Sequence, residues 1–164
     1  MTDRLNRAKG ANALGFDHSY ARLGPAFSTP QAPDPVSDPR LLLWNQNLAD
    51  TLGWSGDPQS DAAQLAALAG NTPLRDSHPI ATVYAGHQFG QYNPQLGDGR
   101  ATLLGEWLTP SGERFDIQLK GAGPTAYSRG GDGRSPIGPV IREYLVSEAM
   151  FTLGVPSTRA LAAI

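Results

Sequence analysis

The sequence contains no cysteine. A chain without thiols has no disulfide framework, no thiolate nucleophile and no cysteine-ligated metal site, so these three kinds of chemistry are excluded. The sequence also has no apolar stretch long enough to span a membrane, and no apolar run of signal-peptide length follows the basic first ten residues. We therefore expect a cytoplasmic protein that does not act in a membrane.

An excess of charge of one sign is also lacking, since the net charge is -2 and the pI is about 5.8. Such a balance gives no global electrostatic attraction to nucleic acid or to an anionic membrane, so any anion site must be local. With 164 residues, 40% of them hydrophobic and 17% charged, the chain has the composition of one main globular domain.

Turn-forming residues are abundant instead, with 19 glycines and 14 prolines. Each proline restricts the preceding residue to extended conformations. Residues 24–39 are therefore predicted to form an irregular arm that wraps over the domain. Its prolines are Pro25, Pro30, Pro33, Pro35 and Pro39.

Two helices are predicted after this arm. The first begins at Pro39, is capped by Ser37 or Asp38, and ends at Gly53. The second is shorter and covers residues 60–69. The apolar stripe of the first helix consists of Leu41, Trp44, Leu48 and Leu52.

A β-hairpin is the clearest local pattern in the sequence. Residues 100–108 and 114–120 are strand-like and flank a turn-rich connection, and a separate short strand is expected over residues 80–85. In the second hairpin strand Phe115, Ile117 and Leu119 alternate with polar residues, so one face is apolar and Lys120 ends the polar face.

A glycine-rich loop over residues 121–138 leads into a predicted helix over residues 139–153, which Gly154 ends. Apolar residues lie nearly all round this helix, so we expect it to be buried. Residues 157–163 can form a last strand. Residues 160–164 are apolar, and we expect this end to be exposed and to cause poor solubility or self-association.

Three glycine clusters are candidates for binding an anion, because glycine lets backbone N–H groups approach closely. In the first, Gly97, Gly99 and Arg100 could hold a phosphate, although a tight Asp-Gly turn is the more favoured interpretation of these residues alone. In the third, which includes Asp132 and Gly133, an anion site and a merely flexible loop are equally favoured.

The second cluster follows Lys120, which could act as a compact cation for nucleotide phosphates or could be an ordinary solvated lysine at a strand end. The next helix offers Glu143 on the same stripe as Val146 and Met150, so its carboxylate is expected to face packed structure and to need a cation. Lys120 is the nearest candidate. A hairpin, a lysine at its end and a helix that offers a glutamate is the arrangement by which kinase small lobes position the phosphates of ATP.

Other nucleotide and metal sites are not indicated. The sequence has no Walker A pattern and no GxGxxG at a strand-to-helix turn. His18, His78 and His87 have no metal-ligand spacing and are taken as structural or surface groups, and Ser128 lacks the context of a nucleophilic serine.

Read together, these motifs resemble the selenoprotein O family, also known as YdiU-type pseudokinases, over nearly the whole chain. The resemblance is carried by residues 16–21 (FDHSYA), 84–90 (YAGHQFG), 94–101 (PQLGDGRA), 118–125 (QLKGAGPT), 127–129 (YSR), 131–134 (GDGR), 142–145 (REYL), 147–150 (SEAM) and 153–161 (LGVPSTRAL).

The resemblance implies an α+β fold like the N-lobe of a protein kinase, an antiparallel sheet with a packed αC-like helix, over residues 79–164. Residues 1–78 would then be an N-terminal extension made of the arm and a capping helix. The implied activity is ATP- and Mg²⁺-dependent transfer of AMP to Ser, Thr or Tyr hydroxyls of proteins. The implied nucleotide contacts are Gly97, Gly99, Arg100, Lys120, Asp132 and Gly133, with Glu143 orienting Lys120.

The same resemblance implies that no catalytic residue and no metal ligand lies in this chain, because the family's catalytic aspartate and magnesium ligands belong to a C-lobe further downstream. Alone, the chain is therefore expected to be inactive. The sequence departs from many relatives at residues 135–140, in the loop before Arg142 and Glu143. The alternative function is a non-catalytic pseudokinase module that binds a nucleotide as a structural ligand.

Overall fold

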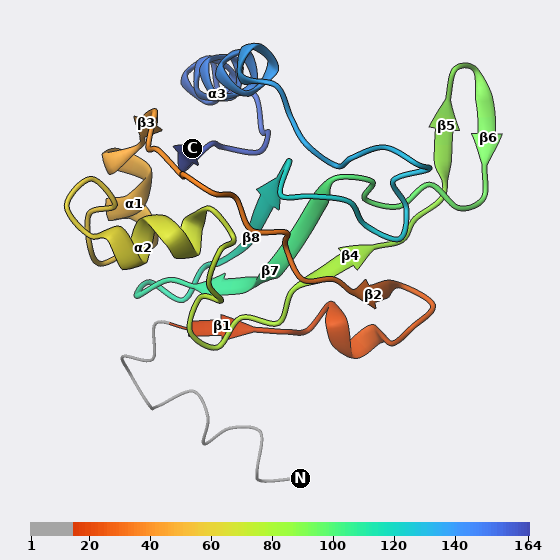
Figure 1. The fold of residues 1–164 in the computed structure, drawn as a ribbon, viewed down its shortest axis with the longest axis horizontal. Coiled ribbons are helices and arrows are strands. Elements are labelled where there is room, and N and C mark those ends of the chain that lie inside the picture. Colours follow the sequence, from red (N-terminus) through yellow and green to blue (C-terminus); the bar gives the residue numbers. More distant parts are fainter. Residues whose placement is uncertain (1–14) are drawn as a thin grey trace, which may run out of the picture.

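The computed structural model describes residues 15–164, so the basic segment Met1–Gly10 lies outside the described residues. The fold is α+β (Figure 1). It contains a five-stranded antiparallel sheet, two separate two-stranded pairs and, in the described range, three α-helices, with one short 3-10 helix at Ala21–Leu23.

The centre of the fold is the predicted hairpin, formed by β7 (Ala101–Leu108) and β8 (Arg114–Lys120). Along β8 exposed and half-buried residues alternate as the sequence predicted. The other edge of β7 pairs with β4 (Ile80–Thr82) and with β1 (Gly15–Asp17). Four of the six residues from Ala101 onward are apolar or glycine and all six are buried, as expected for the central strand of the sheet.

The proline-rich arm is more regular than expected. Within it β2 (Ser28–Pro30) pairs with β4 and becomes an edge strand of the sheet. Pro30 is tolerated because it ends this edge strand, where a missing N–H breaks no inner ladder. Strands from both sides of position 78 thus share one sheet, and the division of the chain there stays a prediction.

The first helix begins later than the sequence predicted. Leu43 and Trp44 form β3 (Leu43–Trp44), which pairs with β9 (Ala162–Ala163), and α1 covers Gln46–Leu52. The side chain of Asn45 accepts the N–H of Leu48 and caps α1. The predicted start at Pro39, with Ser37 or Asp38 as the cap, was wrong because Leu43 and Trp44 pair with a strand at the far end of the sequence. Local helix propensity contains no information about such long-range pairing.

The second helix, α2 (Ala62–Leu68), agrees with its prediction within two residues, and the side chain of Asp61 caps it. Both helices pack on a core cluster of Leu48, Ala49, Leu52, Trp54 and Leu68. Leu161 and Ile164 pack against this cluster, so the expectation of an exposed end at residues 160–164 is wrong. Pairing with β3 supplies the partner that the sequence alone did not identify.

The last helix, α3 (Ile137–Thr152), has no buried residue. The prediction of a buried helix is therefore wrong for the described chain. Large apolar side chains in it and just after it are half or more exposed, namely Leu145, Val146, Phe151 and Leu153. Figure 1 shows α3 beside the sheet, next to β9 and the returning segment 153–161. Only one side of the helix meets the remainder of the described residues.

A β-hairpin formed by β5 (Gly86–Gln88) and β6 (Gln91–Asn93) projects away from the sheet (Figure 1). The sequence predicted a strand continuing to residue 85, whereas β4 ends at Thr82. Among residues 15–164, no helix is both long and apolar enough to cross a membrane.

Candidate functional site

The glycine clusters meet at the open end of the β7–β8 hairpin. Lys120, the last residue of β8, pairs with Ala101, the first residue of β7. The next N–H, that of Gly121, donates to the carbonyl of Arg100 over 2.7 Å. The hairpin therefore brings Arg100 and Lys120 to the same end of two adjacent strands.

The first glycine loop is fastened by a turn over residues 125–128. Thr125 Oγ1 donates to the carbonyl of Asp98, and Ser128 Oγ donates to the carbonyl of Gly99, each over 2.5 Å. The ring of Tyr127 lies so close to Gly97 that a Cβ there would come within 2.3 Å of the ring. The conformation of this loop is therefore fixed by side chains of the next loop.

The third loop lies against the second. Ala122 and Arg134 form an antiparallel bridge, and a Cβ on Gly133 would come within 1.9 Å of the carbonyl oxygen of Gly123. The carboxylate of Asp132 accepts the N–H of Arg134 over 2.9 Å. In this antiparallel register Asp132 lies on the side of the bridge away from Lys120.

The structure brings Lys120 and Glu143 together. The distance from Nζ of Lys120 to Oε2 of Glu143 is 2.6 Å, and the two side chains are 48% and 45% exposed. The hydrogen bond from Lys120 lowers the pKa of the Glu143 carboxyl, burial opposes this, and the charges of Lys120, Arg100 and Arg142 lower it further. The pair lies at a rim open to solvent and not within packed structure, since Val146 and Met150 on the expected stripe are exposed.

Chemically, this rim can attract an anion. Lys120 bonds the Glu143 carboxylate, and Arg100 and Arg142 are near enough for their charges to lower its pKa, so three cations accompany one carboxylate here although the net charge of the chain is -2. The glycines themselves are weaker support, because Gly97, Gly99 and Gly133 are each required by close contacts within the chain. The cations, and not the glycines, therefore carry the case for a phosphate ligand.

The residues of this rim do not by themselves fit a magnesium ion. Within residues 15–164 no three His, Asp or Glu side chains lie close enough together to hold a metal ion. Magnesium normally takes one or two carboxylates together with substrate phosphates and water. We therefore assign no step of a reaction to a metal held by the described residues.

Sequence reasoning missed the residues that hold the loops in place. Thr125, Tyr127 and Ser128 lie between the second and third glycine clusters and fasten the first, and Tyr127 also bonds Thr29 of the arm over 2.7 Å between hydroxyls. Hydroxyl side chains in a turn that follows a proline are a signal for local side-chain-to-backbone bonding. That signal was available in the sequence, but its long-range partners were not.

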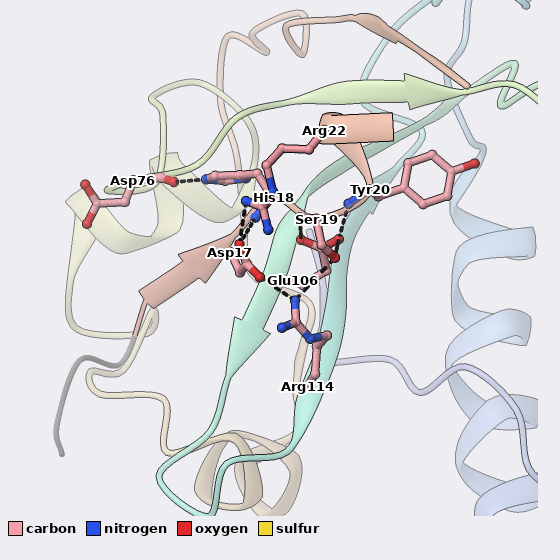
Figure 2. Close-up of polar contacts among 8 residues, drawn as sticks. All are labelled: Asp17, His18, Ser19, Tyr20, Arg22, Asp76, Glu106 and Arg114. Atoms are coloured by element: carbon pink, nitrogen blue, oxygen red, sulfur yellow. Dashed lines mark hydrogen bonds and ion pairs between the residues drawn. The ribbon is translucent and has the colours of Figure 1, made fainter. Parts of the chain in front are cut away.

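A second polar network lies around Glu106 of β7 and is shown in Figure 2. Glu106 accepts hydrogen bonds from the N–H and hydroxyl of Ser19 and from the N–H of Tyr20. Asp17 pairs with Arg22 and with Arg114, each over 2.7 Å. The carboxylates of Asp17 and Glu106 are thus both engaged by groups of the described chain, so we interpret this network as a structural link between the segment after β1 and the hairpin.

Comparison with known proteins shows the family of the chain. The model of a family described as protein adenylyltransferase SelO matches residues 11–164. The chain is 58% identical over 153 residues to the protein nucleotidyltransferase YdiU of Maridesulfovibrio salexigens, covering 93% of this chain and 31% of that protein. It is 59% identical over 152 residues to YdiU of Ruegeria pomeroyi, covering 93% and 32%, and 54% identical over 149 residues to YdiU of Bacillus cereus, covering 91% and 30%. The chain thus spans about a third of the length of these curated relatives.

Proposed function

Because the chain belongs to the SelO family of protein adenylyltransferases, we propose that it forms the nucleotide-binding part of a longer cytoplasmic enzyme that transfers AMP from ATP to protein hydroxyls. The acceptors would be Ser, Thr or Tyr side chains. In this proposal residues 79–164 act as a kinase-like N-lobe, and the chain is inactive without a C-lobe.

One observation carries the proposal: the ion pair between Lys120 and Glu143 at the end of a β-hairpin, with Arg100 beside it. A carboxylate that accepts a hydrogen bond from the ammonium group holds that group in one place, so that the cation can face a triphosphate. Glu143 would orient Lys120 and would not take a proton, because its lowered pKa keeps it ionised at neutral pH.

In the reaction, the acceptor oxygen forms a bond to the α-phosphorus of ATP, the bond from that phosphorus to the bridging oxygen breaks, pyrophosphate leaves, and the hydroxyl proton passes to a base. Lys120 and Arg100 would offset negative charge on the phosphates as it develops. The proposed contacts of Gly97 and Gly99 place the backbone near the nucleotide, and Asp132 and Gly133 would contact its far end. The base would come from outside this chain.

The test is a labelling experiment on the complete protein with ATP, magnesium and casein as a generic acceptor. Label in the α-phosphate should appear on protein and label in the γ-phosphate should not, and mass spectrometry should detect added AMP. Lys120→Ala should lower transfer by about a hundredfold or more, because positioned electrostatic groups contribute factors of this size. Arg75→Ala is the matched control, since Arg75 lies at the surface with its side chain 95% exposed.

Other results would select other functions. Transfer of the γ label would indicate phosphorylation. ATP binding by the wild type with transfer of neither label, to casein or to the protein itself, would indicate the non-catalytic nucleotide-binding module. Full activity of a folded Lys120→Ala protein would contradict the proposed role of the ion pair.

A further inference from the structure

The attachment of α3 decides whether Glu143 can reach Lys120. No residue of α3 is fully buried, and its apolar anchoring is limited to half-buried side chains such as Val140, Ile141 and Tyr144. Glu143 itself lies in the half of α3 nearer its start, and its ion pair with Lys120 is open to solvent. A pair this exposed contributes little by itself, so something else must hold the helix in register.

A second ion pair lies in the other half of α3. Arg159 donates from Nε to Oε1 of Glu148 over 3.0 Å and from its terminal nitrogen to Oε2 over 2.6 Å. This two-point contact is the strong geometry for a guanidinium and a carboxylate. The two side chains are only 18% and 25% exposed, and the guanidinium also lies 3.7 Å from the centre of the Phe151 ring.

Arg159 is in turn fixed to the helical side of the fold. The residue after it, Ala160, accepts the side-chain amide of Asn45 over 3.1 Å, and Leu161 accepts the N–H of Asn45 over 2.9 Å. Two residues further on, β9 pairs with β3. The same Asn45 caps α1. The backbone around Arg159 is therefore hydrogen-bonded to the main core, while the side chain of Arg159 forms an ion pair with α3.

We propose that Arg159 and Glu148 are positioning residues that hold α3 so that Glu143 meets Lys120. The two glutamates are five residues apart, about 7.5 Å along the helix axis, so movement of the helix at Glu148 is transmitted to Glu143. The ring of Phe151 braces the guanidinium from one side. The positioning role does not depend on the proposed function. Only its expected consequence does, namely that loss of the Arg159–Glu148 ion pair weakens ATP binding.

The test compares charge reversals in the complete protein: Arg159→Glu, Glu148→Arg and the double swap of both. The direct readout is the rate at which an amine-acylating reagent modifies Lys120, measured by peptide mapping. Lys120 is the only lysine within residues 15–164, so no other lysine of this segment contributes to its peptide. An amine engaged by a carboxylate is shielded, so each single reversal should raise the rate about threefold or more, and the double swap should return it toward wild type.

Arg75→Glu is the control, because it makes the same charge change at a side chain that is 95% exposed and forms an ion pair with its neighbour Asp76. Melting temperatures establish that each variant is folded. If a single reversal fails to fold, Arg159→Lys serves instead, since a lysine cannot reproduce the two-point contact, and a faster Lys120 reaction is again expected.

A second readout is the dissociation constant of a non-hydrolysable ATP analogue, which each single reversal should raise. In a Glu143→Gln background Arg159→Glu should raise it no further, whereas an effect on general stability would add to that of Glu143→Gln. Unchanged Lys120 reactivity in folded single variants, or a double swap as reactive as the single variants, would overturn the inference. Failure of the wild type to bind the analogue would instead count against the proposed function and leave the Lys120 result intact.

Discussion

Glu106 is a charged side chain inside the sheet, only 4% exposed. Burial acts to raise the pKa of this carboxyl, but hydrogen bonds from the N–H of Tyr20 and from Ser19 lower it below its ordinary value (Figure 2). A buried carboxylate is tolerated when hydrogen-bond donors surround it. Glu106 therefore fixes the segment after β1 on β7 through its charge.

We expect Glu106→Gln to lower the free energy of unfolding by about 2 kcal/mol at pH 7, because the side-chain NH₂ of glutamine would face the hydrogen-bond donors of Ser19 and Tyr20. Since the folded pKa of Glu106 is depressed, its contribution is present above the ordinary value near 4.5 and is lost as the pH falls through the lower folded value. Urea denaturation of both proteins at several pH values should show the difference shrinking below pH 4.5. The exposed Glu113→Gln should change little at any pH, and an equal loss there would contradict this account.

Gly133 and Gly130 allow two reasons for glycine to be told apart, a positive φ angle and a lack of space for a Cβ atom. Both have positive φ, +66° and +82°, but a Cβ on Gly133 would overlap the carbonyl of Gly123 whereas a Cβ on Gly130 would meet nothing within 4 Å. Gly130→Ala should therefore lower stability by about 1 kcal/mol from backbone strain alone. Gly133→Ala should cost about 3 kcal/mol or more, because the two loops must also separate.

Thermal and urea denaturation of the two alanine variants measure this difference. Equal losses would mean that the second and third glycine loops do not touch as described. A change in ATP affinity in Gly133→Ala with unchanged stability would point to direct nucleotide contact by Gly133 in place of a packing role.

At the scale of elements, the β5–β6 hairpin has an unusual turn. Phe89 and Gly90 form its two-residue connection with φ of +54° and +78°, and Phe89 is 95% exposed. Two consecutive positive φ values are typical of a type I′ turn, whose first position favours Asn, Asp or Gly. Phe89 therefore adopts a strained backbone conformation without gaining burial in the described structure.

Phe89→Asn should raise the free energy of unfolding by about 0.5–1 kcal/mol, because asparagine adopts this conformation readily. The control is Phe89→Ala, which removes the ring and keeps a residue that disfavours positive φ. Chemical denaturation of the three proteins measures the effect. A loss of stability in Phe89→Asn would show that the aromatic ring makes contacts that outweigh its strained backbone.

At the scale of the whole molecule, α3 and the residues after it leave many apolar side chains exposed to solvent. Leu145 and Leu153 are 59% and 77% exposed, and Val146, Phe151 and Val155 are also exposed. Exposed apolar surface of this kind favours association. We therefore still expect the 164-residue chain to self-associate, but through this helix and not through residues 160–164, which are packed.

Light scattering of the isolated chain should report species larger than a monomer. Leu145→Gln together with Leu153→Gln should shift the chain toward monomer. Leu23→Gln should not, because Leu23, although 55% exposed, lies in the 3-10 helix near the N-terminus and far from α3 in the sequence. A monodisperse monomer of the unmodified chain would contradict the expectation.

The sequence by itself determined the features that depend on near neighbours in the chain. The β7–β8 hairpin, the alternation along β8 and the bounds of α2 and α3 within two residues follow from turn residues, period-two alternation and glycine stops. Family motifs gave the class of protein, and the positions of Lys120 and Glu143 at the end of a strand and in the next helix led to their expected meeting.

Only the tertiary structure decided what depends on contacts between distant segments. It placed Leu43 and Trp44 in a strand because β9 pairs with them, exposed one side of α3, packed residues 160–164 and brought Arg159 to Glu148. Hydrogen bonds and ion pairs of this kind join residues that share no local periodicity. Their geometry is set by the packing of whole elements, which propensities along the sequence do not contain.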